Sequence, residues 1–283
     1  MGKLDELFGV IKEKRPDTEV LTEIEDRLLV DDIPGAIALL EELEREQNVV
    51  IAVRMILRKI LRMRESEENA EIRFVPLLKS LVPYVNGIKN ERYRALLLGE
   101  LALGFYVIGA ELEGDFALKA SINLALEHPD ILRDIIMNLI NAGLFPKAGY
   151  AMKFVKDREK LDVVLVYLAE VLYERGEEEK ALAVIGHITS NFHRAVALFH
   201  LAEFEKTRNR EKALQFVEWA IRIAERIEDP DARFELMLKL YDLRHEILGE
   251  PLSLSELLAR ETPQEKGPVE DRGPSKGEAS EEP

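Results

Sequence analysis

Apolar residues recur with helical spacing along nearly the whole chain, from Lys3 to Glu261. Hydrophobic positions three and four residues apart follow one another in segment after segment, and no alternating run has the length of a strand. Helix starts are marked by an N-cap next to an early-turn proline, as where Asp32 precedes Pro34 and Asp229 precedes Pro230. The pattern therefore predicts an all-α chain of about fourteen helices.

The first third of the chain is less regular than the rest. Residues 33–47, 48–64 and 66–86 are expected to form three helices that begin the same stack. The third of them contains Pro76 and Pro83, and a proline inside a helix removes a backbone hydrogen bond and crowds the preceding turn. That segment is therefore predicted to be kinked or split.

The most apolar segment lies at residues 95–112 and could suggest a membrane span. It is about 18 residues long, short of the length that a span needs, and it contains Glu100. A buried central helix is the preferred interpretation. Gly99, Gly104 and Gly109 fall inside this pattern at intervals that do not keep them on one helix face, so we expect them to permit close helix packing.

The second half of the chain repeats. Four residues that tolerate a left-handed backbone each close one helical pattern just before the next, and they are Gly114, Gly143, Gly176 and Asn209. Their spacings are roughly 29, 33 and 33 residues. A small residue follows each on the next helix: Ala117, Ala148, Ala181 and Ala213. A fixed period with a small residue in register predicts stacked helical hairpins.

One of these units resembles a tetratricopeptide repeat in three places, at Leu165-x-x-Leu168-Ala169, Tyr173-Glu174-Arg175-Gly176 and Lys180-Ala181-Leu182. The unit that begins near Leu198 is similar, with Asn209 in place of the turn glycine. The usual Trp is absent, and no unit ends in the proline of the family at full register. The resemblance covers about half of the chain and implies a right-handed α-α superhelix, or solenoid, of antiparallel helix hairpins.

In tetratricopeptide proteins the first helix of each pair lines a concave groove. The resemblance places eight residues toward that groove: Arg133, Met137, Val166, Glu170, Tyr173, Phe199, Glu203 and Lys206. Such a mixture suits peptide recognition, although the aromatic members fit the core between repeats as well. Val166 and Phe199 replace the Lys, Asn or Arg with which part of the family clamps a C-terminal carboxylate, which disfavours that ligand.

A basic stripe is the most distinctive charge feature. Its members share residues 48–64 with no acidic residue between them, and they are Arg54, Arg58, Lys59, Arg62 and Arg64. Two interpretations remain open. The stripe pairs with acidic neighbours, which would be Glu41, Glu42, Glu44 and Glu46 or Glu65, Glu67 and Glu68, or it binds an acidic partner peptide or RNA phosphates.

No residues form a recognisable catalytic or cofactor site. The five histidines are His128, His187, His193, His200 and His245. His193 and His200 lie about 10 Å apart on one helix face, too far to share a metal ion. No Glu-x-x-His pair and no glycine-rich phosphate loop occurs in the sequence. We therefore expect no enzyme activity, no cofactor and no metal, with the histidines lying in the groove or on the surface.

Composition limits the classes of partner and the cellular compartment that we expect for this protein. The formal net charge is −15, which disfavours nucleic acid and basic-patch membrane binding. There is no cysteine and no secretory signal, which suits a cytoplasmic protein. Glutamine is scarce beside abundant Glu, Lys and Arg, and this combination resembles proteins from hyperthermophiles.

Together these features predict four segments. Residues 1–88 would be the N-terminal helical part of the solenoid, 89–250 the tetratricopeptide-like repeats, 251–261 a capping helix, and 262–283 a disordered acidic tail. The expected function is a non-catalytic scaffold that binds a peptide or helix of another protein. The alternatives are an RNA- or nucleotide-associated regulatory protein that uses the basic stripe, and an enzyme whose site is assembled from scattered helix residues.

Overall fold

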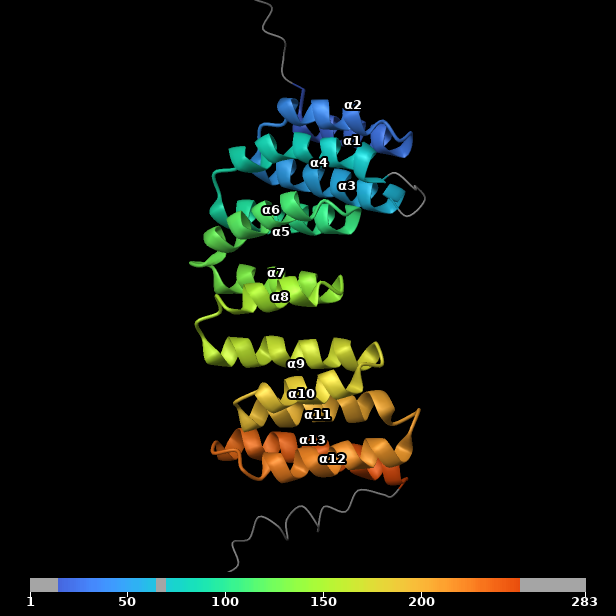
Figure 1. Cartoon of the computed structure of the whole chain (residues 1–283), viewed down its shortest axis with the longest axis vertical. Helices are drawn as coiled ribbons and strands as arrows, with labels where there is room; N and C mark the ends of the chain where they lie inside the picture. The colour runs from blue at the N-terminus through green and yellow to red at the C-terminus, as the bar shows by residue number, and fades with distance from the viewer. Residues whose placement is uncertain (1–14, 65–69, 250–283) are drawn as a thin grey trace, which may run out of the picture. The chain divides into compact units, whose positions relative to one another are not determined.

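A computed structural model of the chain describes residues 15–64 and 70–249. Within those ranges the chain forms thirteen α-helices, one short 3-10 helix and no strand (Figure 1), so the all-α prediction is confirmed. The first helices are α1 (Asp17–Leu29), α2 (Ile33–Ala38), α3 (Glu46–Arg64), α4 (Ala70–Gly87), α5 (Glu91–Ile108) and α6 (Glu111–Ala125). They are followed by α7 (Pro129–Asn141), α8 (Phe145–Met152), α9 (Arg158–Glu174), α10 (Glu178–His187), α11 (Asn191–Glu205), α12 (Arg210–Ala224) and α13 (Pro230–Leu248).

The chain divides into two compact units, residues 1–197 and 198–283, with the boundary inside α11. The expected boundary between residues 88 and 89 lies within the first unit, in the stretch that joins α4 to α5. The expected capping helix at 251–261 and the acidic tail at 262–283 lie outside the described residues.

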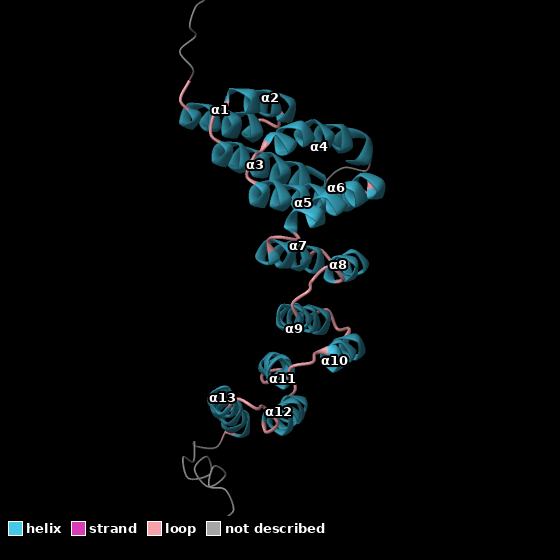
Figure 2. Cartoon of the chain, turned by 90° about the vertical axis from the view of Figure 1, so that its left-hand side faces the viewer, coloured by secondary structure: helices cyan, strands magenta, loops and turns pink. Residues whose placement is uncertain are grey.

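Helices of the first unit pack as neighbours in two ways. Successive helices form hairpins, with α5 against α6 and α9 against α10 as the most extensive pairs. In addition α1, α3, α5, α7 and α9 each pack against the next of their own series. We call this series the A helices, and α2, α4, α6, α8 and α10 the B helices. Figure 2 shows α7 and α9 on one side of this packing and α8 and α10 on the other.

The core of the first unit is continuous along the A helices. One set of buried apolar residues runs from α1 to α5, and a second runs from α5 to α9. Helix α5 contributes to both, and Ala95, Leu101 and Ala102 in it are fully buried. The predicted buried central helix is therefore confirmed. No helix of the described ranges combines the length and apolar character needed to cross a bilayer.

Left-handed glycines close several of the helices, and two of them, Gly143 and Gly176, are turn glycines that the repeat predicts. Gly143 after α7 has φ +76° and Gly176 after α9 has φ +80°. Gly109 after α5 and Gly249 after α13 have the same conformation, with φ +101° and +70°. Such a backbone strains any residue with a Cβ atom, so glycine at these positions fixes where each helix ends. The expectation that Gly109 permits close packing inside a helix was wrong, because this residue is exposed and ends α5.

Two of the predicted helix ends were wrong. Gly114 is buried inside α6, where a Cβ atom would lie 2.6 Å from Cε1 of the Tyr106 ring, so close packing explains this glycine. Asn209 has an extended backbone, and its side chain accepts a hydrogen bond of 3.1 Å from the N–H of Lys212. It is therefore the N-cap of α12 rather than the end of α11.

The small residues after the turns behave as predicted. Ala148, Ala181 and Ala213 are fully buried, and Ala117 is half-buried. A methyl group at these positions allows the second helix of the hairpin to approach its neighbours closely. The proline-containing segment, which was predicted to be kinked or split, is not split: α4 is a single helix from residue 70 to 87.

Acidic side chains at the start of A helices cap the next helix of the series. Asp17 in α1 accepts hydrogen bonds of 3.0 and 3.1 Å from the N–H groups of Glu44 and Arg45, just before α3 begins. Glu46, the first residue of α3, accepts in the same way from Lys89 and Asn90, just before α5 begins. Helices α1 and α3 thereby satisfy donors at the N-terminus of the next A helix, and this fixes the register of α1, α3 and α5.

A second repeated contact joins a turn to the helix that follows it. The guanidinium of Arg94 donates a hydrogen bond to the carbonyl of Ile88, six residues earlier. The same contact links Arg194 to the carbonyl of Ile188 and Arg233 to the carbonyl of Ile227. The sequence carries this motif as Ile-x-(Asn/Ser/Asp)-x-x-x-Arg, starting at 88, 188 and 227. It was missed because its spacings, unlike those of the glycines, are irregular.

Candidate interaction surface

Exposed and half-buried side chains of the A helices recur with helical spacing and define one face of each helix. In α3 they include Ile51, Arg54, Arg58 and Arg62, three or four residues apart. In α9 the corresponding side chains are the exposed Val163 and Glu174 with the half-buried Tyr167 and Glu170, and in α5 they are Leu96, Leu103 and Val107, which are all half-buried. Positions at this spacing share one side of a helix. We call these positions, together with their counterparts in α1 and α7, the A face.

Part of the predicted groove in the first unit belongs to the A face. Arg133 is exposed in α7, and Met137 and Glu170 are half-buried. Val166 and Tyr173, by contrast, are only 7% and 5% exposed, so they lie in the packing between helices and offer little surface to a partner. One residue turns a helix by about 100°, so the more accessible positions of α9 are the half-buried Tyr167 and the exposed Glu174, one residue later than expected.

The remaining predicted groove residues lie in the second unit. Phe199, Glu203 and Lys206 are all half-buried in α11. Lys206 forms ion pairs of 3.2 Å with Glu203 and 3.1 Å with Glu246 of α13. The hydrogen bond to Glu246 and the one to Glu203 raise the pKa of Lys206 above its ordinary value. This part of the prediction therefore coincides with a network that joins α11 to α13 within the second unit.

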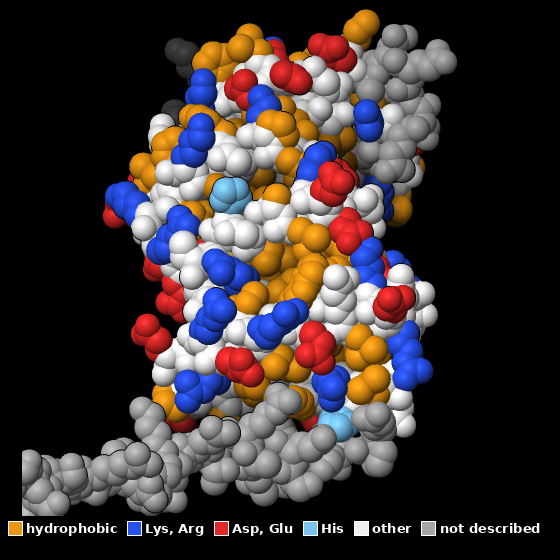
Figure 3. All heavy atoms as spheres, turned by 60° about the horizontal axis from the view of Figure 1, so that its bottom comes forward, with side chains coloured by type: hydrophobic (Ala, Val, Ile, Leu, Met, Phe, Trp, Pro, Cys, Tyr) orange, Lys and Arg blue, Asp and Glu red, His pale blue; other side chains and the backbone are white. Residues whose placement is uncertain are grey.

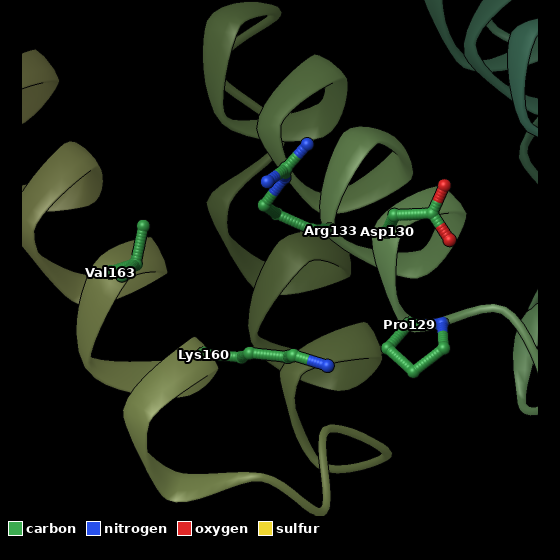
Figure 4. A pocket seen from close by; sticks show the side chains of 5 residues that line it. All are labelled: Pro129, Asp130, Arg133, Lys160 and Val163. Carbon is green, nitrogen blue, oxygen red and sulfur yellow. The ribbon is translucent and has the colours of Figure 1, made fainter.

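A shallow hollow lies between α7 and α9 on the A face. Its volume is about 180 Å³, and its lining residues are Pro129, Asp130, Arg133, Lys160 and Val163. Figure 4 shows that Lys160 and Val163 come from one helix and that the Lys160 side chain extends toward Pro129 of the other. The hollow thus presents two cationic groups beside apolar surface, and of its lining only Arg133 was expected from the sequence.

Among the described residues, the ion-pair partners of the two cations of the hollow are local. Arg133 contacts Asp134, its neighbour in sequence, at 3.1 Å, and Lys160 contacts Asp157 at 3.7 Å. All four of these side chains are 43–51% exposed, and exposed ion pairs contribute little stability. Asp130, by contrast, has a partner on another helix: it accepts a hydrogen bond from Arg92 of α5, which lowers the pKa of Asp130. Arg133 and Lys160 can therefore turn toward an acidic ligand without breaking a structural contact between helices.

The basic stripe on α3 contains two residues that form ion pairs with other helices or turns and three that form none within the described residues. Arg54 forms a bidentate pair with Glu100 of α5, at 3.0 and 2.7 Å, and Lys59 pairs with Asp31 at the end of α1. Neither acid is one of the neighbours expected from the sequence. Within the described residues no ion pair is formed by the other three arginines of the stripe, which are Arg58, Arg62 and Arg64 and are all exposed.

One polar cluster in the first unit was not anticipated. Tyr106 of α5 donates a hydrogen bond of 2.6 Å to Asp115 of α6, and Lys147 of α8 reaches the same oxygen at 2.5 Å. Lys147 also lies over the Tyr106 ring, 4.8 Å from its centroid. Burial and the contact with Asp115 raise the pKa of Tyr106, which keeps the phenol neutral. This cluster joins three helices, and its members are too far apart in sequence to form a motif.

The histidines do not gather into a site in the described ranges, where no group of three His, Asp or Glu side chains could hold a metal ion. The expectation that all five histidines lie in the groove or on the surface was wrong for His245, which is buried in α13 and only 5% exposed.

On the face of the molecule shown in Figure 3, basic, acidic and apolar side chains are interspersed. No protein-family model matches this chain, and no curated protein sequence matches it.

Proposed function

We propose that the chain is a non-catalytic scaffold that binds a segment of a partner protein on the A face. In this proposal the hairpins form a tetratricopeptide-like right-handed solenoid, whose first helices line the binding surface. The observation that carries the proposal is the hollow between α7 and α9, where Arg133 and Lys160 lie beside Val163 and, within the described residues, form ion pairs only with near neighbours in sequence.

The size of the hollow supports a protein ligand. Pockets that bury a drug-sized molecule have volumes from about 300 Å³ upward. At about 180 Å³ this hollow accommodates one side chain of a bound segment rather than a whole small molecule. A peptide gains affinity by adding several such contacts along neighbouring helices, and the A face continues from α7 to α5 and α3 on one side and to α9 on the other.

The helical packing supplies the second element of the proposal. A surface built on helices that are fixed to one another by capping carboxylates such as Asp17 and Glu46 changes little when a ligand binds. Binding then costs less ordering entropy than it would on a loop. We place this scaffold in the cytoplasm, which a chain without cysteine suits.

Partner capture from a lysate of the source organism tests the proposal. The tagged chain is compared with the double variant Lys160→Glu/Val163→Glu, which places two carboxylates in the hollow. The matched control is Phe116→Glu/Lys119→Glu on the B helix α6, where Phe116 is 66% exposed and the two positions have the same spacing. Both variants exchange one apolar and one lysine side chain for glutamate on a single helix.

We expect the native chain and the α6 variant to retain the same partner protein, and the α9 variant to lose it. Circular dichroism of the three proteins checks that each is equally helical. Equal capture by all three, or loss only with the α6 variant, contradicts binding on the A face.

A further inference from the structure

The stripe on α3 lies between two other A helices, and the capping contacts define how the three align. Asp17 begins α1 and caps the residues before α3, and Glu46 begins α3 and caps those before α5. Counting from the first residue of each helix, Leu29 of α1 and Leu103 of α5 occupy the position that Arg58 occupies in α3. Arg58 therefore has a leucine at the equivalent position on either side.

The apolar side chains of this region are unusually exposed. Leu29 is 73% exposed, Val30 is 74% exposed and Ile51 of α3 is 48% exposed. Leu103 is half-buried. Lys59 pairs with Asp31, the residue after Val30, and this ion pair holds the end of α1 against the middle of α3. Apolar surface of this kind stabilises nothing within the described chain and gains free energy when a partner covers it.

The cations between these apolar residues lie one helical turn apart. Arg58 and Arg62 are both exposed and form no ion pair within the described residues, whereas Arg54 is held by Glu100. Side chains four residues apart on a helix are about 5–6 Å apart at their Cβ atoms. The same spacing separates two carboxylates on successive turns of a second helix, so two ion pairs can form side by side.

We propose that Leu29, Ile51, Arg58, Arg62 and Leu103 form a docking site for an acidic amphipathic helix of a partner protein. The partner lays its apolar side on the leucines and Ile51, and its carboxylates, one turn apart, meet Arg58 and Arg62. This inference rests on the proposed scaffold function and names the chemistry of a bound segment.

Charge and hydrophobicity together favour this ligand over nucleic acid. Phosphates would pair with the two arginines but would gain nothing from Leu29 and Ile51, whose burial requires an apolar partner. The net charge of −15 also opposes the approach of a polyanion, while a short segment with a few carboxylates is repelled far less. The experiment therefore includes RNA as a competing ligand, and preferential binding of RNA would contradict the proposal.

Synthetic peptides measure this site directly by fluorescence anisotropy with the full chain. The probe is a helical peptide of about 18 residues with leucines on one side and pairs of glutamates one turn apart beside them. In a second peptide every glutamate is glutamine, and in a third every leucine is serine. We expect each of these two to bind at least about tenfold more weakly than the probe, because each removes one of the two contacts.

Variants of the chain locate the binding. Arg58→Glu/Arg62→Glu should weaken probe binding by about tenfold or more, and Leu29→Ser should weaken it about threefold or more. The matched control, Lys153→Glu/Lys156→Glu, makes the same change of charge at exposed positions between α8 and α9 and should have no effect.

Three results would overturn the inference. They are equal affinity of the glutamate and glutamine peptides, unchanged binding by the Arg58→Glu/Arg62→Glu variant, and a single-stranded polyuridine that binds more tightly than the probe at physiological salt. The scaffold proposal fails separately, through the α9 variant in partner capture, because Lys160→Glu/Val163→Glu leaves the α3 site intact.

Discussion

The carboxylate of Asp162 in α9 accepts a hydrogen bond of 2.8 Å from the backbone N–H of Ser190, the residue before α11 begins. It also accepts from the N–H and the hydroxyl of Thr189, at 3.1 and 2.7 Å. Asp162 is only 1% exposed, so these donors replace the water that it loses on folding. The contact repeats what Asp17 and Glu46 do for α3 and α5.

Removal of this carboxylate should destabilise the first unit. Asp162→Ala removes the charged acceptor from the N–H groups of Thr189, which is exposed, and Ser190, which is half-buried, so we expect the free energy of unfolding to fall by about 1–2 kcal/mol. Chemical denaturation followed by circular dichroism at pH 7 measures the loss. A change below about 0.5 kcal/mol would show that the contact does not hold the helices in register.

The same residue gives a pH dependence of known sign. Burial raises the pKa of Asp162, but the hydrogen bonds from Ser190 and Thr189 outweigh burial and lower it below its ordinary value. A carboxylate whose pKa is lower in the folded than in the unfolded chain stabilises the fold above the unfolded value of about 3.9. The difference in unfolding free energy between the native chain and Asp162→Asn should be constant from about pH 5 to 8 and shrink below about pH 4. A difference that grows on acidification contradicts this account.

Glycines that look alike in sequence should respond oppositely to alanine. At Gly114 a Cβ atom would lie 2.6 Å from the Tyr106 ring, whereas a Cβ atom at Gly149 in α8 would have no atom within 4 Å apart from its chain neighbours and the nearby backbone of its own helix. Gly114→Ala should therefore cost about 1–3 kcal/mol through crowding, and Gly149→Ala should stabilise by up to about 1 kcal/mol through helix propensity. Melting temperatures of the two variants should move in opposite directions. A shift of both in the same direction would show that Tyr106 does not confine Gly114.

The pair between Arg54 and Glu100 is a testable link between α3 and α5. Both side chains are partly buried, 34% and 24% exposed, and the contact is bidentate. A double-mutant cycle with Arg54→Met and Glu100→Gln should give a coupling energy of about 1 kcal/mol. A coupling energy near zero would show that Arg54 and Glu100 do not stabilise the contact between α3 and α5.

Much of the helical architecture could be predicted from the sequence because helix signals are local. Apolar spacing, the turn glycines Gly143 and Gly176 and the small residues after them each act within a few turns of chain. Errors arose where one residue type serves two purposes. Gly114 is conformationally ordinary and is needed for packing against Tyr106, and Asn209 caps the start of a helix instead of closing one. The tetratricopeptide-like superhelix and the thermophilic origin stay predictions.

The interaction surface was less predictable because it depends on helix rotation. An error of one residue in register places Val166 and Tyr173 on the surface when they are buried, and leaves Val163 unnoticed although it is exposed. The ion pairs of Arg54 and Lys59 join residues that are far apart in sequence, and no local pattern identifies such partners. What the sequence did show was the concentration of arginine on α3.

Site-specific photo-crosslinking tests the central claim, binding of a partner on the A face, most directly. A benzophenone amino acid is placed at Val163 on α9 or, for comparison, at Phe116 on α6, both of which are exposed. After irradiation in cells, mass spectrometry identifies any attached peptide. We predict a discrete crosslinked partner from position 163 and none from position 116, whereas adducts from position 116 alone, or from neither position, would contradict the account.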